Sequence, residues 1–93
     1  MPRLEFAPDV MEDFERILDH LLKSQIRDPA ARMKGITSAV GILEDNPLVG
    51  KPAKDGLREL VIGRGANGYV ALYRYLEEID TVFVLAIRGQ REA

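Results

Sequence analysis

The chain has 93 residues, no cysteine, one histidine and a formal charge of −2, with 46% apolar and 30% charged content. A chain of this length buries roughly 65% of its unfolded surface, so we expect one domain over residues 1–93. The absence of cysteine excludes disulfides and thiolate metal sites and suits a reducing cytoplasm. No apolar run approaches the ~20 residues of a membrane span, and the slight acidity argues against a general nucleic-acid binder. We therefore expect a cytoplasmic protein without membrane association, metal or other cofactor.

The first elements along the chain are a short strand and a helix. Residues 3–7 alternate polar and apolar side chains, which predicts a strand. Asp9 and Glu12 then have the spacing of a capping box at a helix start. The apolar residues that follow at helical spacing are Val10, Phe14, Ile17, Leu18, Leu21 and Leu22. This pattern predicts a helix of about four turns with one apolar face.

A second helix is predicted to pack against the first. Asp28-Pro29 favours a helix start, because proline is already set for the first helical position. Asn46-Pro47 ends the pattern, since the residue before a proline avoids helical geometry. The apolar residues of its inward face are Met33, Ile36, Val40 and Leu43. Two such helices with a short link should form an antiparallel hairpin.

Three strands are predicted beyond a polar loop over residues 48–56. The segments 57–62, 69–76 and 81–88 are rich in β-branched and aromatic residues. Asn67-Gly68 predicts a tight hairpin turn between the first two, and residues 77–80 make the next turn. The order is therefore β-α-α-β-β-β. We expect an α+β fold in which the helical hairpin packs on one face of a small, curved antiparallel sheet.

Two motifs suggest chemistry but have simpler explanations. Residues 63–68 match the dinucleotide pattern G-x-G-x-x-G, yet a strand follows instead of the helix that would hold a pyrophosphate. The single histidine, His20, falls on the polar side of the first helix without a nearby nucleophile. We predict neither a nucleotide site nor a histidine-based active site.

The arginines of the second half are the most informative charged set. They are Arg58, Arg64, Arg74, Arg88 and Arg91. Residues 1–46 carry 6 basic and 9 acidic side chains, whereas residues 47–93 carry 7 and 6, so any anion-seeking surface should lie in the second half. The planar guanidinium suits phosphate or carboxylate recognition. Two interpretations stay open: a shared edge formed by Arg74, Arg88 and Arg91, or scattered arginines with local acidic partners.

Taken together, the elements resemble the RelE/ParE superfamily of bacterial toxins from type II toxin–antitoxin operons. The segments that carry the resemblance are Phe6-Ala7-Pro8, Asn46-Pro47, Leu57-Arg58-Glu59-Leu60, Gly68–Arg74 and Val82–Arg88. RelE-like members cut messenger RNA on the ribosome with basic side chains, while ParE-like members poison DNA gyrase. The RelE pattern has two lysines on the first strand of the meander and an arginine after the hairpin Gly-Tyr. Here these positions hold Glu59, Val61 and Val70.

The resemblance implies a toxin that a cognate antitoxin neutralises, in the manner of a plasmid-stabilisation module. Because the nuclease positions are not basic, we expect a ParE-like, non-enzymatic inhibitor of DNA gyrase that contacts its target through Arg74, Arg88 and Arg91. The alternative is a ribosome-dependent endoribonuclease that uses Lys51, Lys54, Arg64 and Arg88. A third possibility is a non-toxic module that only binds the antitoxin.

The antitoxin surface is predicted from exposed apolar positions. Antitoxins of this family supply a segment that folds onto the toxin, often as a helix in a groove. We expect Leu18 and Leu22 on the first helix, and Val82 and Val84 on the last strand, to lose exposure in a toxin–antitoxin hetero-oligomer.

Overall fold

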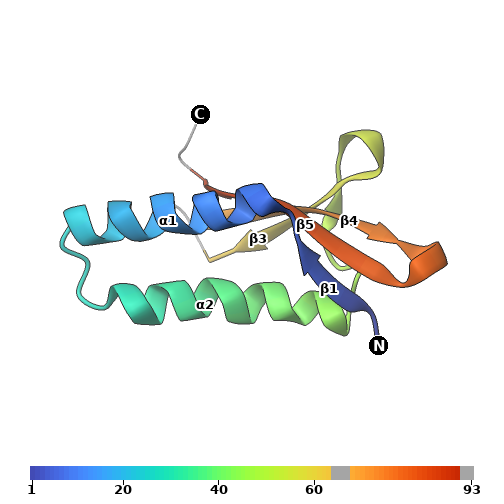
Figure 1. Cartoon of the computed structure of the whole chain (residues 1–93), viewed down its shortest axis with the longest axis horizontal. Helices are drawn as coiled ribbons and strands as arrows, with labels where there is room; N and C mark the ends of the chain where they lie inside the picture. Colours follow the sequence, from blue (N-terminus) through green and yellow to red (C-terminus); the bar gives the residue numbers. More distant parts are fainter. Residues whose placement is uncertain (64–67, 91–93) are drawn as a thin grey trace.

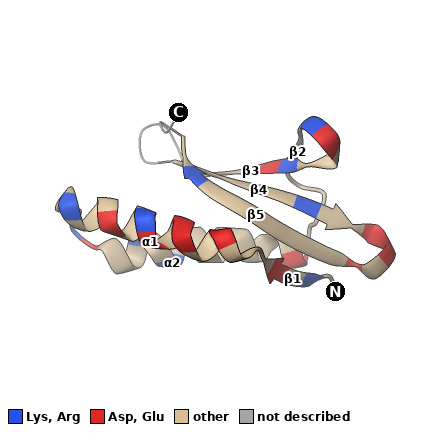
Figure 2. Ribbon diagram, turned by 45° about the horizontal axis from the view of Figure 1, so that its top comes forward, with Lys and Arg blue, Asp and Glu red and all other residues tan. Residues whose placement is uncertain are grey.

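The computed structural model describes residues 1–63 and 68–90. In chain order the elements are β1 (Arg3–Phe6), α1 (Pro8–Lys23), α2 (Pro29–Gly41), the 3₁₀ turn η1 (Ile42–Glu44), β2 (Lys51–Pro52), the turn η2 (Lys54–Gly56), β3 (Arg58–Ile62), β4 (Tyr69–Leu76), the turn η4 (Glu77–Ile79) and β5 (Thr81–Gly89). The two helices run antiparallel and cover one face of the sheet (Figures 1 and 2). The predicted α+β architecture is confirmed. None of the helices in these described ranges is long and apolar enough to cross a membrane.

The sheet is mixed, with the strand order β1-β5-β4-β3-β2. β3, β4 and β5 pair antiparallel, as predicted for the meander. β2 is a two-residue edge strand that pairs antiparallel with β3 and that we did not predict. β1 departs from the prediction because it pairs parallel with β5, with Leu4 opposite Val82. These two strands are far apart in the sequence, so no local turn dictates their relative direction. After β1, the helical hairpin of α1 and α2 brings the chain back toward the end of the sheet at which β1 starts.

The two helices begin differently. The side chain of Asp28 accepts the backbone N–H of Ala31 at 3.1 Å and caps α2, with Pro29 in the first turn as predicted. For α1 the prediction was two residues late, because Asp9 was the expected cap, whereas the helix begins at Pro8 and its N-cap is Ala7, which has no side-chain cap. Asp9 lies instead in the first turn, where its negative charge interacts favourably with the helix dipole.

The core lies between the helices and the sheet. Its buried residues from the helical layer are Val10, Ile17, Leu21, Ile36, Val40 and Leu43, and those from the sheet are Ile62, Tyr69, Ala71, Tyr73, Val82, Val84 and Ile87. Every buried side-chain polar atom in the described part of the chain has a hydrogen-bond partner. The core therefore holds the helices on one face of the sheet, and none of the described helices α1 and α2 covers the other face (Figure 2).

Candidate functional site

The segment that joins the helical layer to β3 is held by two side chains. The hydroxyl of Tyr73 accepts the N–H of Gly50 and donates to the carbonyl oxygen of Pro47, both at 2.8 Å. Arg58 donates to the carbonyl oxygens of Leu48 and Gly50 at 3.1 and 2.7 Å. A Cβ at Gly50 would lie 2.5 Å from the Tyr73 hydroxyl oxygen, so this close approach requires glycine. These hydrogen bonds therefore fix the conformation of the segment.

The two lysines of the nuclease alternative lie on this segment. Lys51 belongs to β2 and pairs with Glu59 in the register, while Lys54 begins the turn η2. Both side chains are exposed. The sequence suggested an irregular loop here, whereas the structure gives Lys51 a fixed backbone. Lys51 is nevertheless placed next to a carboxylate, which reduces the positive potential at that point.

The sheet face opposite the helices, here termed the open sheet face, carries most of the other candidates. Alternation along the strands assigns these side chains to it: Lys51, Glu59, Val61, Val70, Leu72, Arg74, Phe83 and Arg88. Most of the apolar ones are half-buried, and Val61 is 59% exposed. The open sheet face is therefore an apolar surface with separate charges, and Figure 2 shows the basic residues spread along the strands.

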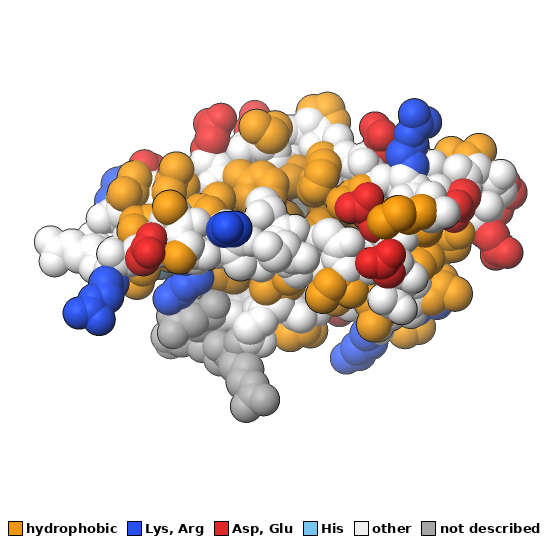
Figure 3. Space-filling view, turned by 90° about the horizontal axis from the view of Figure 1, so that it is seen from below, with side chains coloured by type: hydrophobic (Ala, Val, Ile, Leu, Met, Phe, Trp, Pro, Cys, Tyr) orange, Lys and Arg blue, Asp and Glu red, His pale blue; other side chains and the backbone are white. Residues whose placement is uncertain are grey.

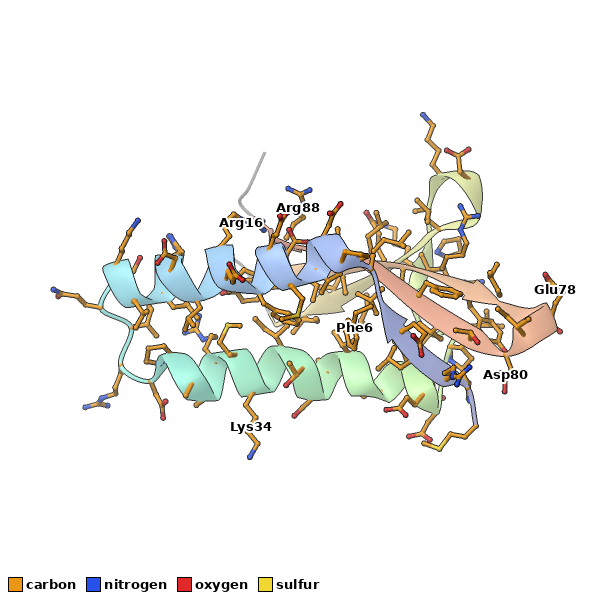
Figure 4. All side chains as sticks on the ribbon, viewed as in Figure 1. Phe6, Arg16, Lys34, Glu78, Asp80 and Arg88 are labelled. Carbon is orange, nitrogen blue, oxygen red and sulfur yellow. The ribbon has the colours of Figure 1, made fainter. Side chains whose placement is uncertain are left out.

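The arginines predicted to contact the target share this face but do not converge. Arg88 pairs with Val70 in the register, and Arg74 lies four positions further along β4, or roughly 13 Å at 3.3 Å per residue. Arg74 donates to the carbonyl oxygen of Asp55 at 2.8 Å. Arg88 is exposed near the end of β5, on the same side of the molecule as Arg16 (Figure 4). Arg64 and Arg91, and the hairpin turn at Asn67-Gly68, involve residues outside the described ranges.

The three positions that the ribonuclease pattern requires to be basic form one patch. Val61 and Val70 are opposite each other on β3 and β4. Glu59 is two positions along β3 from Val61 and opposite Leu72. All three side chains point to the open sheet face, since their strand neighbours Leu60 and Ala71 pack toward the core. The patch therefore presents one carboxylate and two aliphatic side chains where a nuclease would present three cations.

The predicted antitoxin contacts divide into exposed and buried residues. Leu18 and Leu22 of α1 are 38% and 57% exposed, as the prediction requires. Val82 and Val84 are fully buried under the helical layer, so the expectation that they have exposure to lose is wrong. They alternate with outward residues of β5 and point to the face that α1 covers. The sequence pattern alone did not determine which face of β5 the helices would cover.

Met11 is an apolar surface residue that we did not predict. It is 62% exposed and precedes Leu18 by two helical turns, so Met11, Leu18 and Leu22 form one stripe, here termed the outer stripe. The 3.6-residue period of the helix places Met11 on the same face as Leu18, so the sequence did contain a signal for its position. Phe6 at the end of β1 is also 45% exposed and lies between the helices in Figure 4. Figure 3 shows that the side of the molecule below α2 also carries apolar side chains interspersed with charged ones.

No group of three or more histidine or acidic side chains in the described ranges is arranged to hold a metal ion. The acidic residues of η4 and the following turn, Glu77, Glu78 and Asp80, lie at the tip between β4 and β5 (Figure 4). The hydroxyl of Tyr75 donates to Asp80 at 2.6 Å, which raises the pKa of Tyr75 to about 12. The apolar areas described above are the open sheet face and the outer stripe of α1.

Two helices over one face of a five-stranded mixed sheet define the architecture of the RelE/ParE-type toxins, and the solved structures bear this out. The chromosomal ParDE toxin–antitoxin system of P. aeruginosa matches with a TM-score of 0.79 at 22% identity and covers 96% of both chains. The intact E. coli RelBE toxin–antitoxin complex matches with a TM-score of 0.71 at 12% identity, over 99% of this chain and 100% of the other. The Mycobacterium tuberculosis RelBE2 complex matches with a TM-score of 0.58 at 25% identity, over 97% and 100%.

The family model resolves the assignment further. The model for the ParE toxin of the type II toxin–antitoxin system parDE matches residues 4–93, so the chain belongs to the ParE toxin family. No curated protein matches the sequence significantly. The resemblance inferred from the order of the elements is thereby confirmed at the level of family and fold.

Proposed function

We propose that this toxin, when free, arrests growth by binding DNA gyrase and does not cut RNA, and that a cognate antitoxin neutralises it by covering the outer stripe. The observation that carries the choice of target is the patch formed by Glu59, Val61 and Val70. A metal-free ribonuclease depends on cations that stabilise charge on the phosphoryl group in the transition state. Here the corresponding side chains cannot supply that stabilisation.

The magnitude of the loss supports the same choice. Removing one preorganised donor from a transition state costs roughly 2.7–4 kcal/mol. Three such losses together would remove most of the rate enhancement. Glu59 would in addition repel an RNA phosphate, because it lies beside Lys51 on the surface that the RNA would approach. A surface with half-buried aliphatic residues and separate arginines suits contact with a protein better.

The decisive experiment compares the two targets directly. The chain is induced alone in a bacterial host, and growth, the DNA-damage response and mRNA integrity are recorded. In parallel, the purified chain is added to DNA gyrase in a supercoiling assay. We expect growth arrest, DNA damage and inhibition of supercoiling with intact mRNA. Prompt mRNA cleavage without DNA damage would reject the gyrase proposal, and normal growth with soluble expression would favour a module that only binds antitoxin.

Arginine variants test the contact surface in the same assay. We expect Arg74→Gln and Arg88→Gln each to weaken gyrase inhibition. Arg3→Gln is the matched control, because Arg3 is an exposed arginine of β1 whose charge already faces Glu5 at 3.6 Å. Equal inhibition by all three variants would remove Arg74 and Arg88 from the proposed contact.

A ribonuclease remains the second candidate because of the fixed backbone at Lys51. A site needs side chains on rigid elements, and β2 supplies one. Purified chain added to translating ribosomes would then release cleaved mRNA, and the double variant Lys51→Ala/Lys54→Ala would abolish the cleavage. Absence of product at high toxin concentration rejects this candidate.

The antitoxin proposal rests on the outer stripe. An apolar row along a helix is the usual seat of a partner helix or extended segment that folds on binding. The neighbours named above include toxins solved together with their antitoxins. We therefore propose a cognate antitoxin that buries Met11, Leu18 and Leu22.

A further inference from the structure

Beside the helical hairpin lies a further apolar surface that the function described so far does not use. Both helices continue past the end of β3 (Figure 1). A hollow of about 680 Å³ lies between the first half of α2, the link that precedes it and the adjoining ends of β3 and β4. We term it the α2 hollow. Its apolar lining consists of Ile26, Ala31, Ile36, Ile62 and Tyr69.

The α2 hollow is open because α2 presents small residues to it. Ala31 and Gly35 are one turn apart on the helix and both line the hollow. A Cβ built on Gly35 would have no atom within 4 Å. Ile36 and Tyr69 are buried and form part of the apolar lining. There is consequently room for an apolar side chain from outside, with packing surface already in place.

The rim of the α2 hollow is basic. Arg27 and Arg32 both line it, and no hydrogen bond or ion pair joins either side chain to another described residue. Asp28 also lines it, but its carboxylate is engaged with the N–H of Ala31. Residues 23–34 carry four basic and one acidic side chain, in a protein whose net charge is −2. An occupant with a negative charge next to an apolar group would pair with the basic rim and pack against the apolar lining.

We propose that the α2 hollow receives an apolar side chain with a neighbouring carboxylate, carried by the cognate antitoxin. This inference rests on the proposed antitoxin partner and names a second anchor for it. The position of the hollow supports the same occupant, because Ile26 in its wall follows Leu22 of the outer stripe by only four residues. Such a partner segment would follow the outer stripe to the end of α1 and continue past the link to the hollow. Electrostatic pairing with Arg27 and Arg32 would set its register.

Two variants remove the proposed anchor without disturbing the core. Gly35→Leu fills the hollow, and it should fold because leucine is a better helix former than glycine and the space is open. Its control is Gly41→Leu, which makes the same change in α2 where a Cβ also meets nothing. Arg32→Gln removes a rim charge. Its control is Lys34→Gln, since Lys34 points away from the body of the protein (Figure 4).

Small probes test the chemistry of the hollow on the isolated chain. The probes are 8-anilinonaphthalene-1-sulfonate, which is apolar and anionic, and N-phenyl-1-naphthylamine, its uncharged analogue. We expect both to shift the amide NMR signals of Ile36 and Ile62, with the anionic probe binding several-fold more tightly. Gly35→Leu should abolish these shifts, and Arg32→Gln should reduce the preference for the anion. Shifts confined to α1, or unchanged in Gly35→Leu, would overturn the inference.

The complex itself tests the occupant. The antitoxin to be tested would be encoded by a short reading frame adjacent to that of the toxin, and its affinity is measured by calorimetry. We expect Gly35→Leu to weaken binding about tenfold or more, because burial of one aliphatic side chain is worth at least that factor. The two control variants should bind like the wild type. Full affinity of Gly35→Leu overturns this inference alone, whereas failure of the wild-type chain to bind overturns the proposed partner as well.

Discussion

The carboxylate of Asp13 accepts the backbone N–H of Ile87 at 2.9 Å. Arg16, one turn further along α1, donates to the carbonyl oxygen of Ile87 at 3.0 Å and to Asp13 at 2.8 Å. β1 pairs with β5 only as far as Val84, so beyond that point the edge of β5 away from β4 has no strand partner among residues 1–63 and 68–90. Two side chains of α1 thus replace the missing strand and tie the helical layer to the sheet.

Asp13→Ala should destabilise the protein by about 2 kcal/mol, because it leaves the buried N–H of Ile87 without an acceptor. Asp13→Asn should cost less, since its side-chain oxygen can still accept that hydrogen bond. Urea unfolding gives both values. The control is Asp19→Ala, whose exposed partner Lys23 lies at 3.4 Å and which should change stability by less than about 0.5 kcal/mol. Equal stabilities for Asp13→Ala and Asp19→Ala would contradict the bridging role.

Tyr73→Phe should lower stability by about 1–3 kcal/mol, because it leaves the Gly50 N–H and the Pro47 carbonyl oxygen unpaired. Heteronuclear NMR should in addition show faster amide exchange at Gly50, since the segment loses its anchor. Tyr75→Phe is the matched control, because the Tyr75 hydroxyl bonds to Asp80 at the exposed turn. If Gly50 exchanges equally slowly in both variants, Tyr73 does not hold the segment.

The elements with strong local signals were predicted closely. β4 has the predicted bounds, Tyr69–Leu76, because it is rich in aromatic and β-branched residues and turn signals flank it on both sides. α2 starts at Pro29 with Asp28 as its cap, since that pair of residues specifies a helix start by its own chemistry. These predictions needed only contacts between neighbours in the chain.

The features that depend on distant contacts could not be read in the same way. The parallel direction of β1, the burial of Val82 and Val84 and the role of Asp13 all depend on how α1 lies across β5. The α2 hollow likewise exists only because Ile26 and Tyr69, far apart in the sequence, face one space. The burial of Asp13 is likewise an effect of tertiary structure, because an aspartate in a surface helix is ordinarily exposed.

The hydrogen bond from Tyr75 to Asp80 should appear in the alkaline titration of the protein. It is the main cause that raises the pKa of Tyr75 to about 12, from about 10 in an unfolded chain. The folded form then holds its proton where the unfolded form has lost it, so the stabilisation is complete below pH 10 and is lost as pH rises toward 12. Absorbance at 295 nm, as the difference between wild type and Tyr75→Phe, measures this titration.

Asp80→Asn supplies the test of the cause. Without the carboxylate, the pKa of Tyr75 should fall toward its ordinary value, because a neutral amide oxygen is a weaker acceptor for the hydroxyl and the local negative charge is removed. Glu78→Gln is a suitable control, since Glu78 lies in the same turn but is not among the causes of the shift. Were Glu78→Gln to lower the pKa as much as Asp80→Asn, the general charge of the turn would be responsible instead.

Charge placed on the outer stripe should separate antitoxin binding from folding. Leu22→Asp alters a side chain that is 57% exposed, so we expect a stability change within about 0.5 kcal/mol. In the complex the same carboxylate would be buried without a partner, which should weaken binding by at least about tenfold. Ile79→Asp is the matched control, because Ile79 is 61% exposed at the β4–β5 turn, away from the outer stripe. Calorimetry with the antitoxin measures the affinities, and hydrogen exchange should show added protection along α1 for the wild type. Wild-type affinity of Leu22→Asp would place the antitoxin elsewhere on the molecule.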